Sequence, residues 1–167
     1  MFRQRAENLF SARKLCCAEA LLYLMNRGFR GELPPDAAIR IGTGFCHGMG
    51  NAEHVCGAVT GGIMALGLFL GPGSRANMKK KQLWSVIKEL TDRFQHLQNS
   101  TSCDILLLDA KENKISKSEN CMDLTGLGAE ITVDILLRER PQLKDQLDLS
   151  FLNERESKLS GLIKRLI

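Results

Sequence analysis

Residues 42–70 read GTGFCHGMGNAEHVCGAVTGGIMALGLFL, and this stretch decides the fold. A glycine-rich loop that carries Cys46 and His47 leads into a polar turn, and an apolar segment follows with Cys56 at its start. Each glycine inside a helix costs about 1 kcal/mol relative to alanine. A sequence keeps several glycines near one thiol where another backbone or a ligand must come close. We therefore expect Cys56 to face a binding site.

Length and composition predict one helical domain. A chain of 167 residues can bury a core but is too short for two domains of ordinary size. Its residues are 44% hydrophobic and only 5% aromatic, which favours helices over strands. We predict an all-α, single-domain bundle of about five to seven helices. Residues 1–140 are expected to form the cysteine-containing domain, and residues 141–167 a helical extension that packs on it or on a dimer partner.

The charge and hydropathy patterns exclude several classes of protein. The net charge of +4 is spread along the chain, whereas a nucleic-acid interface needs clustered basic residues interleaved with aromatic ones. The longest apolar run, residues 55–70, is shorter than the ~20 residues of a membrane-spanning helix and predicts a buried core helix. We see no secretory signal at the N-terminus, so we expect a cytoplasmic protein. No hydrolase motif or phosphate-binding loop is present in the sequence.

The apolar spacing predicts the individual helices. The clearest covers residues 75–98 behind a Ser74 cap, with Trp84 widening its buried face. Its buried seam consists of Leu83, Ile87, Leu90, Phe94 and Leu97. The other predicted helices cover residues 2–26, 36–41, 55–70, 103–108 and 120–137, the first closed by Gly28 and the last capped by Asn120. Residues 109–119 are predicted to form an exposed loop. A last helical region follows Pro141 and carries an apolar stripe of Leu159, Leu162, Ile163 and Leu166.

The six cysteines are the residues most able to carry chemistry. Without an export signal they are expected to be reduced thiols, metal ligands or redox groups, not a disulfide framework. Cys56, Cys103 and Cys121 fall at predicted helix starts, where free N–H groups and the helix dipole favour a thiolate. Cys17 is expected on a buried helix face. Its neighbour Cys16 points about 100° away and is expected to be a spectator.

These thiols carry a resemblance to a known family. The sequence Cys17-Ala-Glu-Ala-Leu, the block Cys56-Gly-Ala-Val-Thr-Gly before an apolar helix, Cys103-Asp-Ile-Leu-Leu and Cys121 resemble the C-GCAxxG-C-C redox-active proteins over about residues 9–137. The resemblance implies that Cys17, Cys56, Cys103 and Cys121 are the four cysteines of the family. It also implies a link to the split-Soret cytochromes, which are dimeric electron-transfer proteins with haem and an iron-sulfur centre.

The sequence departs from this pattern in two informative ways. It has no Cys-x-x-Cys-His motif, so the residues for covalent haem attachment are missing. Of the two cofactors of the split-Soret cytochromes, only the iron-sulfur centre is therefore expected here. Cys46 and His47 stand where the family usually shows glycines. Together with His54 and Cys56 they form a second constellation that could bind zinc or another transition metal.

Three functions are compatible with the sequence. The first is an iron-sulfur protein in electron transfer or redox sensing, with the four cysteines as ligands and with Gly57 and Ala58 donating backbone hydrogen bonds to sulfur. The second is a cofactor-free thiol-disulfide protein in which Cys56 attacks and a second thiol resolves the mixed disulfide. The third is a structural or interaction protein with zinc in the site. A redox partner protein and a homodimer are expected for the first.

Overall fold

The computed structural model describes residues 1–13 and 15–154 of the chain, and within these residues it consists of helices joined by turns and loops, with one isolated bridge and no strand. This confirms the all-α prediction. The helices are α1 (Phe2–Arg13), α2 (Cys17–Gly28), α3 (Pro35–Thr43), α4 (Cys46–Met49), α5 (Gly57–Leu70), α6 (Lys80–Gln98), α7 (Cys103–Glu112), α8 (Lys117–Glu139), the 3-10 helix η1 (Pro141–Gln146) and α9 (Leu149–Asn153).

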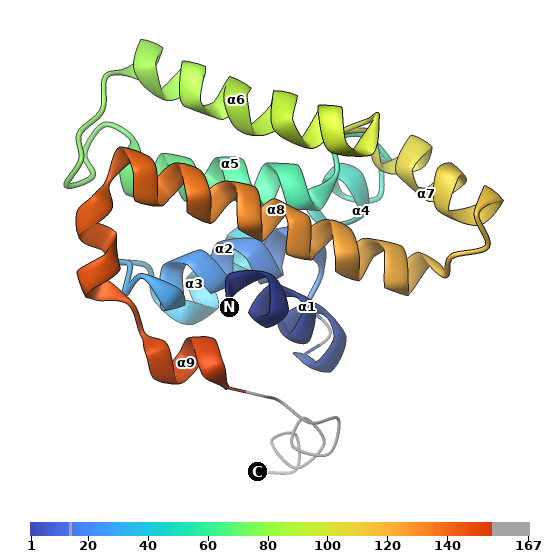
Figure 1. Ribbon diagram of the computed structural model, residues 1–167, viewed down its shortest axis with the longest axis horizontal. Helices are drawn as coiled ribbons and strands as arrows, with labels where there is room; N and C mark the ends of the chain where they lie inside the picture. Colours follow the sequence, from blue (N-terminus) through green and yellow to red (C-terminus); the bar gives the residue numbers. More distant parts are fainter. Residues whose placement is uncertain (14, 155–167) are drawn as a thin grey trace.

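The centre of the fold is a group of three helices, α2, α5 and α8, that pack on one another. Figure 1 shows that they run in the same direction, so their N-termini lie at one end of the molecule. Small residues let them approach closely. A Cβ at Gly61 of α5 would lie 2.8 Å from Leu21 Cβ on α2, and one at Gly128 of α8 would lie 2.8 Å from the Ala58 carbonyl oxygen. The glycines of the central stretch therefore serve helix packing first.

Helices α1 and α6 cover this group from two sides (Figure 1). Helix α1 is tied to α8 by Arg3, which pairs with Glu130 at 2.7 Å, with Asp123, and with Glu7 of its own helix at 2.9 Å. Helix α6 packs on α5 and α8 through buried residues that include Leu83, Leu90 and Phe94. Over the described residues, no helix is both long and apolar enough to cross a bilayer.

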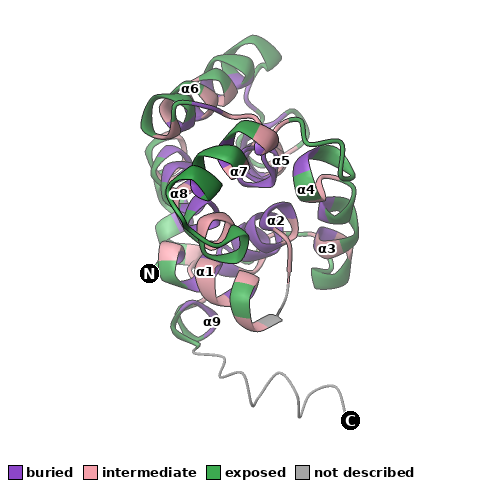
Figure 2. Cartoon of the chain, turned by 90° about the vertical axis from the view of Figure 1, so that its right-hand side faces the viewer, coloured by how far each residue is buried: buried purple, intermediate pink, exposed green. Residues whose placement is uncertain are grey.

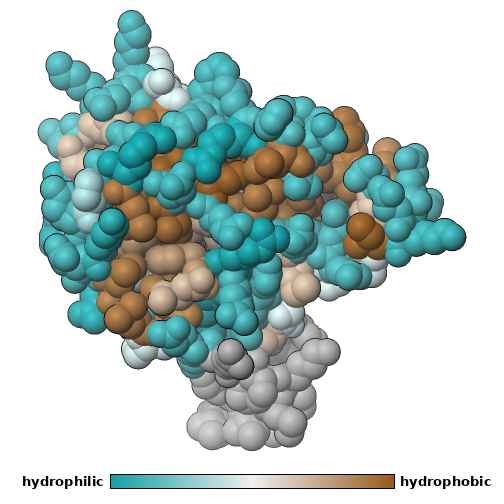
Figure 3. Space-filling view, in the orientation of Figure 1, coloured by the Kyte–Doolittle hydropathy of each residue, from teal (hydrophilic) through white to brown (hydrophobic). Residues whose placement is uncertain are grey.

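Two predictions about the buried face of α6 are wrong. Trp84 is 64% exposed and Leu97 is 55% exposed, although both were expected to be buried. Because α6 packs on only one side of the bundle, the strip it buries is narrower than its apolar stripe. On the face drawn in Figure 3, hydrophobic side chains accordingly reach the surface in patches between hydrophilic ones.

Several predicted helix ends also differ. The helix predicted over 2–26 is two helices, with a break before Cys17, although Gly28 does end the second as expected. The break is stabilised by Glu19, whose carboxylate accepts a hydrogen bond from the Cys16 amide at 2.9 Å. This is half of a capping box with cysteine in place of serine or threonine. Ser74 lies in a turn, and α6 begins after Lys79.

The N-terminus of α8 is a further correction. Its cap is Ser116, whose hydroxyl oxygen accepts a hydrogen bond from the Glu119 amide at 3.2 Å, and not Asn120. Asn120 lies inside the helix and donates to the Leu106 carbonyl oxygen at 3.1 Å. Because α7 ends at Glu112 and α8 begins at Lys117, the loop predicted over 109–119 is mostly helical.

Residues 141–154 fold back onto the N-terminal helices. Leu143, Phe151 and Leu152 are buried, and the Asp148 amide donates to the Gly28 carbonyl oxygen at 2.9 Å. A domain boundary at residue 140 stays a prediction. The predicted stripe of Leu159, Leu162, Ile163 and Leu166 lies outside the described residues.

Candidate redox site

A cavity of about 530 Å³ lies at the end of the molecule where α2, α5, α7 and α8 begin. Figure 2 looks at this end of the molecule and shows α2, α5, α7 and α8 near one another. Cys17, Cys56, Cys103 and Cys121 all line the cavity. Four thiols that are spread over more than a hundred positions of the sequence therefore reach one space, each from a different helix.

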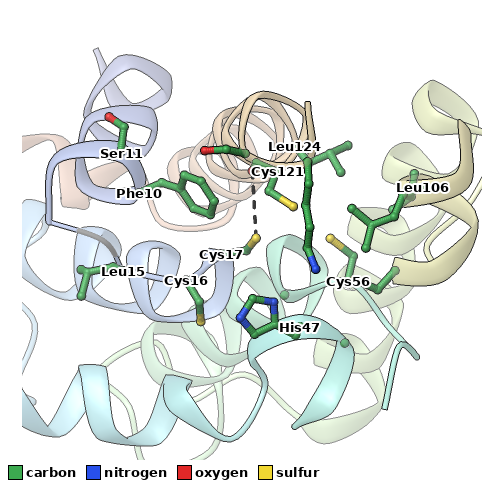
Figure 4. A pocket seen from close by; sticks show the side chains of 16 residues that line it. Phe10, Ser11, Leu15, Cys16, Cys17, His47, Cys56, Leu106, Cys121 and Leu124 are labelled. Atoms are coloured by element: carbon green, nitrogen blue, oxygen red, sulfur yellow. Dashed lines mark hydrogen bonds between the residues drawn. The ribbon is translucent and has the colours of Figure 1, made fainter. Parts of the chain in front are cut away.

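The walls between the thiols are mostly apolar. Phe10 of α1 and Leu15 line one part of the cavity, while Leu106, Leu107 and Leu124 line another. Figure 4 shows the sulfur atoms of Cys17, Cys56 and Cys121 pointing into the space between these walls. A cavity of this volume is in the range that cofactors and small ligands occupy.

The loops before α5 and α7 hold two of the cysteines in fixed register. Val55 and Ser102 form the isolated antiparallel bridge. Next to it, the Cys56 amide donates to the Thr101 carbonyl oxygen at 2.8 Å, and the Cys103 amide donates to the His54 carbonyl oxygen at 2.6 Å. The starts of both helices are thus joined by backbone hydrogen bonds that depend on no side chain.

Cys17 and Cys121 are held by the contact of α2 with α8. The Cys17 Sγ lies 4.0 Å from the Cys121 carbonyl oxygen, which also accepts a 2.6 Å hydrogen bond from the Thr125 hydroxyl (Figure 4 draws the sulfur contact). Gly57 keeps Cys17 close to Cys56, since a Cβ at Gly57 would lie 3.0 Å from the Cys17 Cβ. Cys17, Cys56 and Cys103 are buried and Cys121 is half-buried.

The cavity disfavours free thiolates. The Cys121 thiol acts to lower the pKa of Cys17, but the Cys56 thiol and burial outweigh it and raise that pKa to about 12. Interaction with the Cys17 thiol and burial raise the pKa of Cys121, and burial together with Cys121 raises the pKa of Cys103. Lys117, which lines the cavity, lowers the pKa of both Cys103 and Cys121 but does not reverse the shift. Without further positive charge, these sulfurs carry protons at neutral pH.

The N-terminal ends of the helices around the cavity supply part of this positive charge. A helix N-terminus carries a partial charge of roughly +0.5, and its first N–H groups have no acceptor within the helix. Cys17 and Cys103 are the first residues of α2 and α7, and Cys56 directly precedes α5. The cavity is therefore suited to a group with net negative charge.

Of the residues predicted at the site, some lie elsewhere. Gly57 and His47 line the cavity, whereas Ala58 is packed against Gly128 and has no exposed surface. His54 is exposed and contributes only its backbone carbonyl oxygen. The second constellation is thus not assembled around one point.

Cys46 is joined to Cys16 by a disulfide, with the two Cα atoms 5.7 Å apart. The prediction that Cys16 is a spectator is wrong, because Cys16 forms half of this disulfide. The other four cysteines are free thiols. Sequence gave no sign of this pair, because the two residues are separated by 30 positions. Cys16, Cys46 and Glu19 hold their ligand atoms within 4.8 Å of one another, a group that could bind a metal through thiolates only after reduction.

The segment after Cys46 has an unusual backbone. His47, Gly48, Met49, Gly50 and Asn51 are all in the left-handed region, with φ between 53° and 71°, and Glu53 follows at 60°. This conformation costs roughly 1–2 kcal/mol for each non-glycine residue. Gly48 is required here, since a Cβ on it would lie 2.8 Å from the Cys103 Cβ. Strain of this kind persists only where the surroundings fix it.

Sequence reasoning missed Lys117, Phe10 and Cys16 as residues that line the cavity. Lys117 follows Ser116 in the pattern Ser-x-x-Glu, which marks a helix start and could have placed it beside the site.

Comparison with protein-family models matches residues 15–135 to the family described as "Putative redox-active protein (C_GCAxxG_C_C)". The chain belongs to this family. The matched region holds all four cysteines of the cavity. The resemblance to this family that was seen in the sequence is confirmed. The link of the C_GCAxxG_C_C family to split-Soret cytochromes stays a prediction. Comparisons with curated proteins and with solved structures gave no match.

Proposed function

We propose that this member of the C_GCAxxG_C_C family binds an iron-sulfur cluster through Cys17, Cys56, Cys103 and Cys121 and acts in electron transfer or redox sensing. The observation that carries the proposal is that four helices each bring one of these cysteines to the same cavity. A bound cluster would supply one-electron chemistry. A redox partner protein, a homodimer and a cytoplasmic location belong to the same proposal.

The residues present fit such a group. Four cysteine thiolates are the ligand set of 2Fe-2S and 4Fe-4S clusters. The cavity also leaves space between its side chains for a bound group. A cluster held by four thiolates carries net negative charge, which the helix starts around the cavity would stabilise. The Gly57 amide, in the first turn of α5, has no acceptor within the helix and could donate to a cluster sulfur.

The pKa shifts favour a metal centre over a thiol-disulfide reaction in which Cys17, Cys103 or Cys121 is the attacking thiol. A nucleophilic thiol needs a low pKa, whereas the pKa values of Cys17, Cys103 and Cys121 are raised. A metal ion displaces protons from such thiols and provides the positive charge that burial withholds. Zinc would do so with the same four donors, so the sulfide content of the protein decides between zinc and an iron-sulfur cluster.

The test is iron and acid-labile sulfide analysis of the full chain purified without oxygen, together with electron paramagnetic resonance of the reduced protein. We expect iron and sulfide in similar amounts and a reducible cluster signal. Cys17→Ala, Cys56→Ala, Cys103→Ala and Cys121→Ala should each lower both contents strongly. Cys46→Ser is the matched control: it removes a thiol of the disulfide but none of the four ligands, and both contents should persist.

Other results would decide for the alternatives. Stoichiometric zinc without sulfide supports the structural zinc site, and colourless protein that loses two cavity thiols on mild oxidation supports the thiol-disulfide protein. If Cys46→Ser lowers the iron content as much as Cys56→Ala does, the ligand set proposed here is wrong.

A further inference from the structure

Two cysteines outside the four-thiol set are bonded to each other, and one of them, Cys16, lines the cavity. Cys16 lines the cavity and directly precedes α2, and Cys46 opens the left-handed segment. Both residues are half-buried. Glu19 fixes the surroundings of the pair, because its carboxylate accepts hydrogen bonds from the Cys16 amide at 2.9 Å and from the Thr43 hydroxyl at 2.7 Å.

The disulfide restrains the segment 47–53 at one end, together with backbone hydrogen bonds that Gly50 and Asn51 donate to the Cys46 carbonyl oxygen at 3.0 and 3.2 Å. At the other end, the Asp104 amide donates to the Glu53 carbonyl oxygen at 3.2 Å, next to the Cys103 bond to His54. Between these points the backbone is in the left-handed region at all but one residue. The segment presents His47 and Gly48 to the cavity, and Gly48 lies against Cys103. Figure 4 shows the His47 ring between Cys16 and Cys56.

We propose that Cys16–Cys46 is a second redox site, a reversible disulfide whose reduction releases the segment 47–53 and uncovers the four-thiol cavity. The reductant is a dithiol. One of its thiolates attacks a sulfur of the pair, the Cys16–Cys46 bond breaks, and a mixed disulfide forms. The second thiol of the reductant then displaces the remaining cysteine. Cys16 and Cys46 end as thiols, having gained two electrons and two protons, and the reductant ends as a disulfide.

Release follows from the strain. A left-handed backbone that is restrained at both ends can relax toward ordinary φ values once the disulfide at one end is broken. The segment has no regular helix or strand of its own to retain it, since α4 contains non-helical residues. The proposal concerns the cysteine pair and access to the cavity, and it does not depend on what the cavity binds.

The first experiment measures the redox equilibrium. Metal-free full chain is equilibrated in mixtures of reduced and oxidised dithiothreitol, quenched with a maleimide in denaturant, and weighed by mass spectrometry. We expect four labels in oxidising mixtures and six in reducing ones, with one reversible step and no change in helix content. Peptide mapping should assign the two additional labels to Cys16 and Cys46. In Cys16→Ser, five labels are expected in every mixture. A disulfide that is reduced only after the protein unfolds would refute a redox role.

The second experiment measures access to the cavity. The rates at which a small maleimide labels Cys56 and Cys103 in the native, metal-free protein are compared between the oxidised chain and the Cys16→Ser/Cys46→Ser variant. We expect labelling to be faster by about tenfold or more in the variant, as for local opening of a segment. Reduced wild-type protein should match the variant.

A destabilised control separates local release from general loss of stability. Leu143→Ala removes a fully buried side chain from η1, which lies at the end of the bundle opposite the cavity (Figure 1). At a denaturant concentration where Leu143→Ala and the double variant have the same unfolded fraction, only the double variant should show fast labelling of Cys56 and Cys103. Equal labelling rates in the two variants would refute the proposal that loss of the disulfide releases the segment 47–53. Because neither experiment uses a cluster, a failure here leaves the iron-sulfur proposal to its own test.

Discussion

The close contact of α2 with α5 in the core can be tested with one methyl group. In Gly61→Ala, the added Cβ would lie 2.8 Å from Leu21 Cβ, 3.0 Å from the Ala18 carbonyl oxygen and 3.1 Å from Ala18 Cα. Two of these atoms belong to the backbone of α2 and cannot rotate away. We therefore expect α2 and α5 to separate slightly, at a cost near the upper end of the ~1–3 kcal/mol range typical of overpacking.

The same helix offers a matched control. In Gly67→Ala, the added Cβ would have no neighbour within 4 Å. Both substitutions gain about 1 kcal/mol of helix propensity, because alanine replaces glycine inside a helix. The net free energy of unfolding should therefore fall by roughly 2 kcal/mol for Gly61→Ala and rise by roughly 1 kcal/mol for Gly67→Ala, given the propensity and overpacking terms.

Urea unfolding followed by circular dichroism measures the difference. With a slope of about 2 kcal/mol per molar urea, a difference of ~3 kcal/mol separates the two midpoints by more than 1 M. Both variants are measured with the disulfide intact, so that the crosslink contributes equally. If Gly61→Ala is as stable as Gly67→Ala, the close approach of α2 and α5 is wrong, and the arrangement of Cys17 and Cys56 at the starts of these helices loses its support.

Three further predictions concern the site. Because the folded state raises the pKa of Cys17 from 9.0 to about 12, the contribution of Cys17 to the free energy of unfolding of the metal-free protein should be constant below pH 9 and fall between pH 9 and 12. A Cys17→Ala variant should therefore show a shallower fall over pH 9 to 12 in urea titrations at each pH. Gly57→Ala, whose Cβ would lie 3.0 Å from the Cys17 Cβ, should lower iron content in anaerobic preparations more than Gly67→Ala does. Ser116→Ala should cost about 1 kcal/mol in urea unfolding because α8 loses its cap, while Ser118→Ala serves as the control without a cap bond.

Sequence predicted the fold class and most helices because apolar spacing reports which face of a helix is buried. Leu83, Leu90 and Phe94 are buried as their spacing requires. Spacing does not report how wide the neighbouring surface is, so Trp84 and Leu97 were placed in the core although they are exposed. The width of a buried strip is set by the helices that pack there.

Helix ends were harder to predict, and the reason is chemical. Cys16 occupies the capping position of α2, where the known preferences are for serine, threonine, aspartate and asparagine, so a cysteine there gave no stop signal. Ser116 did carry the expected Ser-x-x-Glu pattern but stood in a polar stretch that resembled a loop. In both cases the signal lay in a hydrogen bond to one side chain, which composition does not show.

The two groups of cysteines differ in how far sequence could find them. Cys17, Cys56, Cys103 and Cys121 stand at or near the starts of four helices, and packing α2, α5 and α8 in one direction suffices to bring three of those starts together. Their convergence is thus a consequence of secondary structure and helix direction. The contact between Cys16 and Cys46 instead depends on the packing of α3 on the start of α2, where a Cβ at Gly42 would lie 2.8 Å from Glu19 Cα. After Cys46 the backbone takes the left-handed path of residues 47–51, which follows from no local preference of His47 or Met49. A backbone that departs from local preference is held by its surroundings, and here the disulfide is one of the restraints, which is why its reduction should change the cavity.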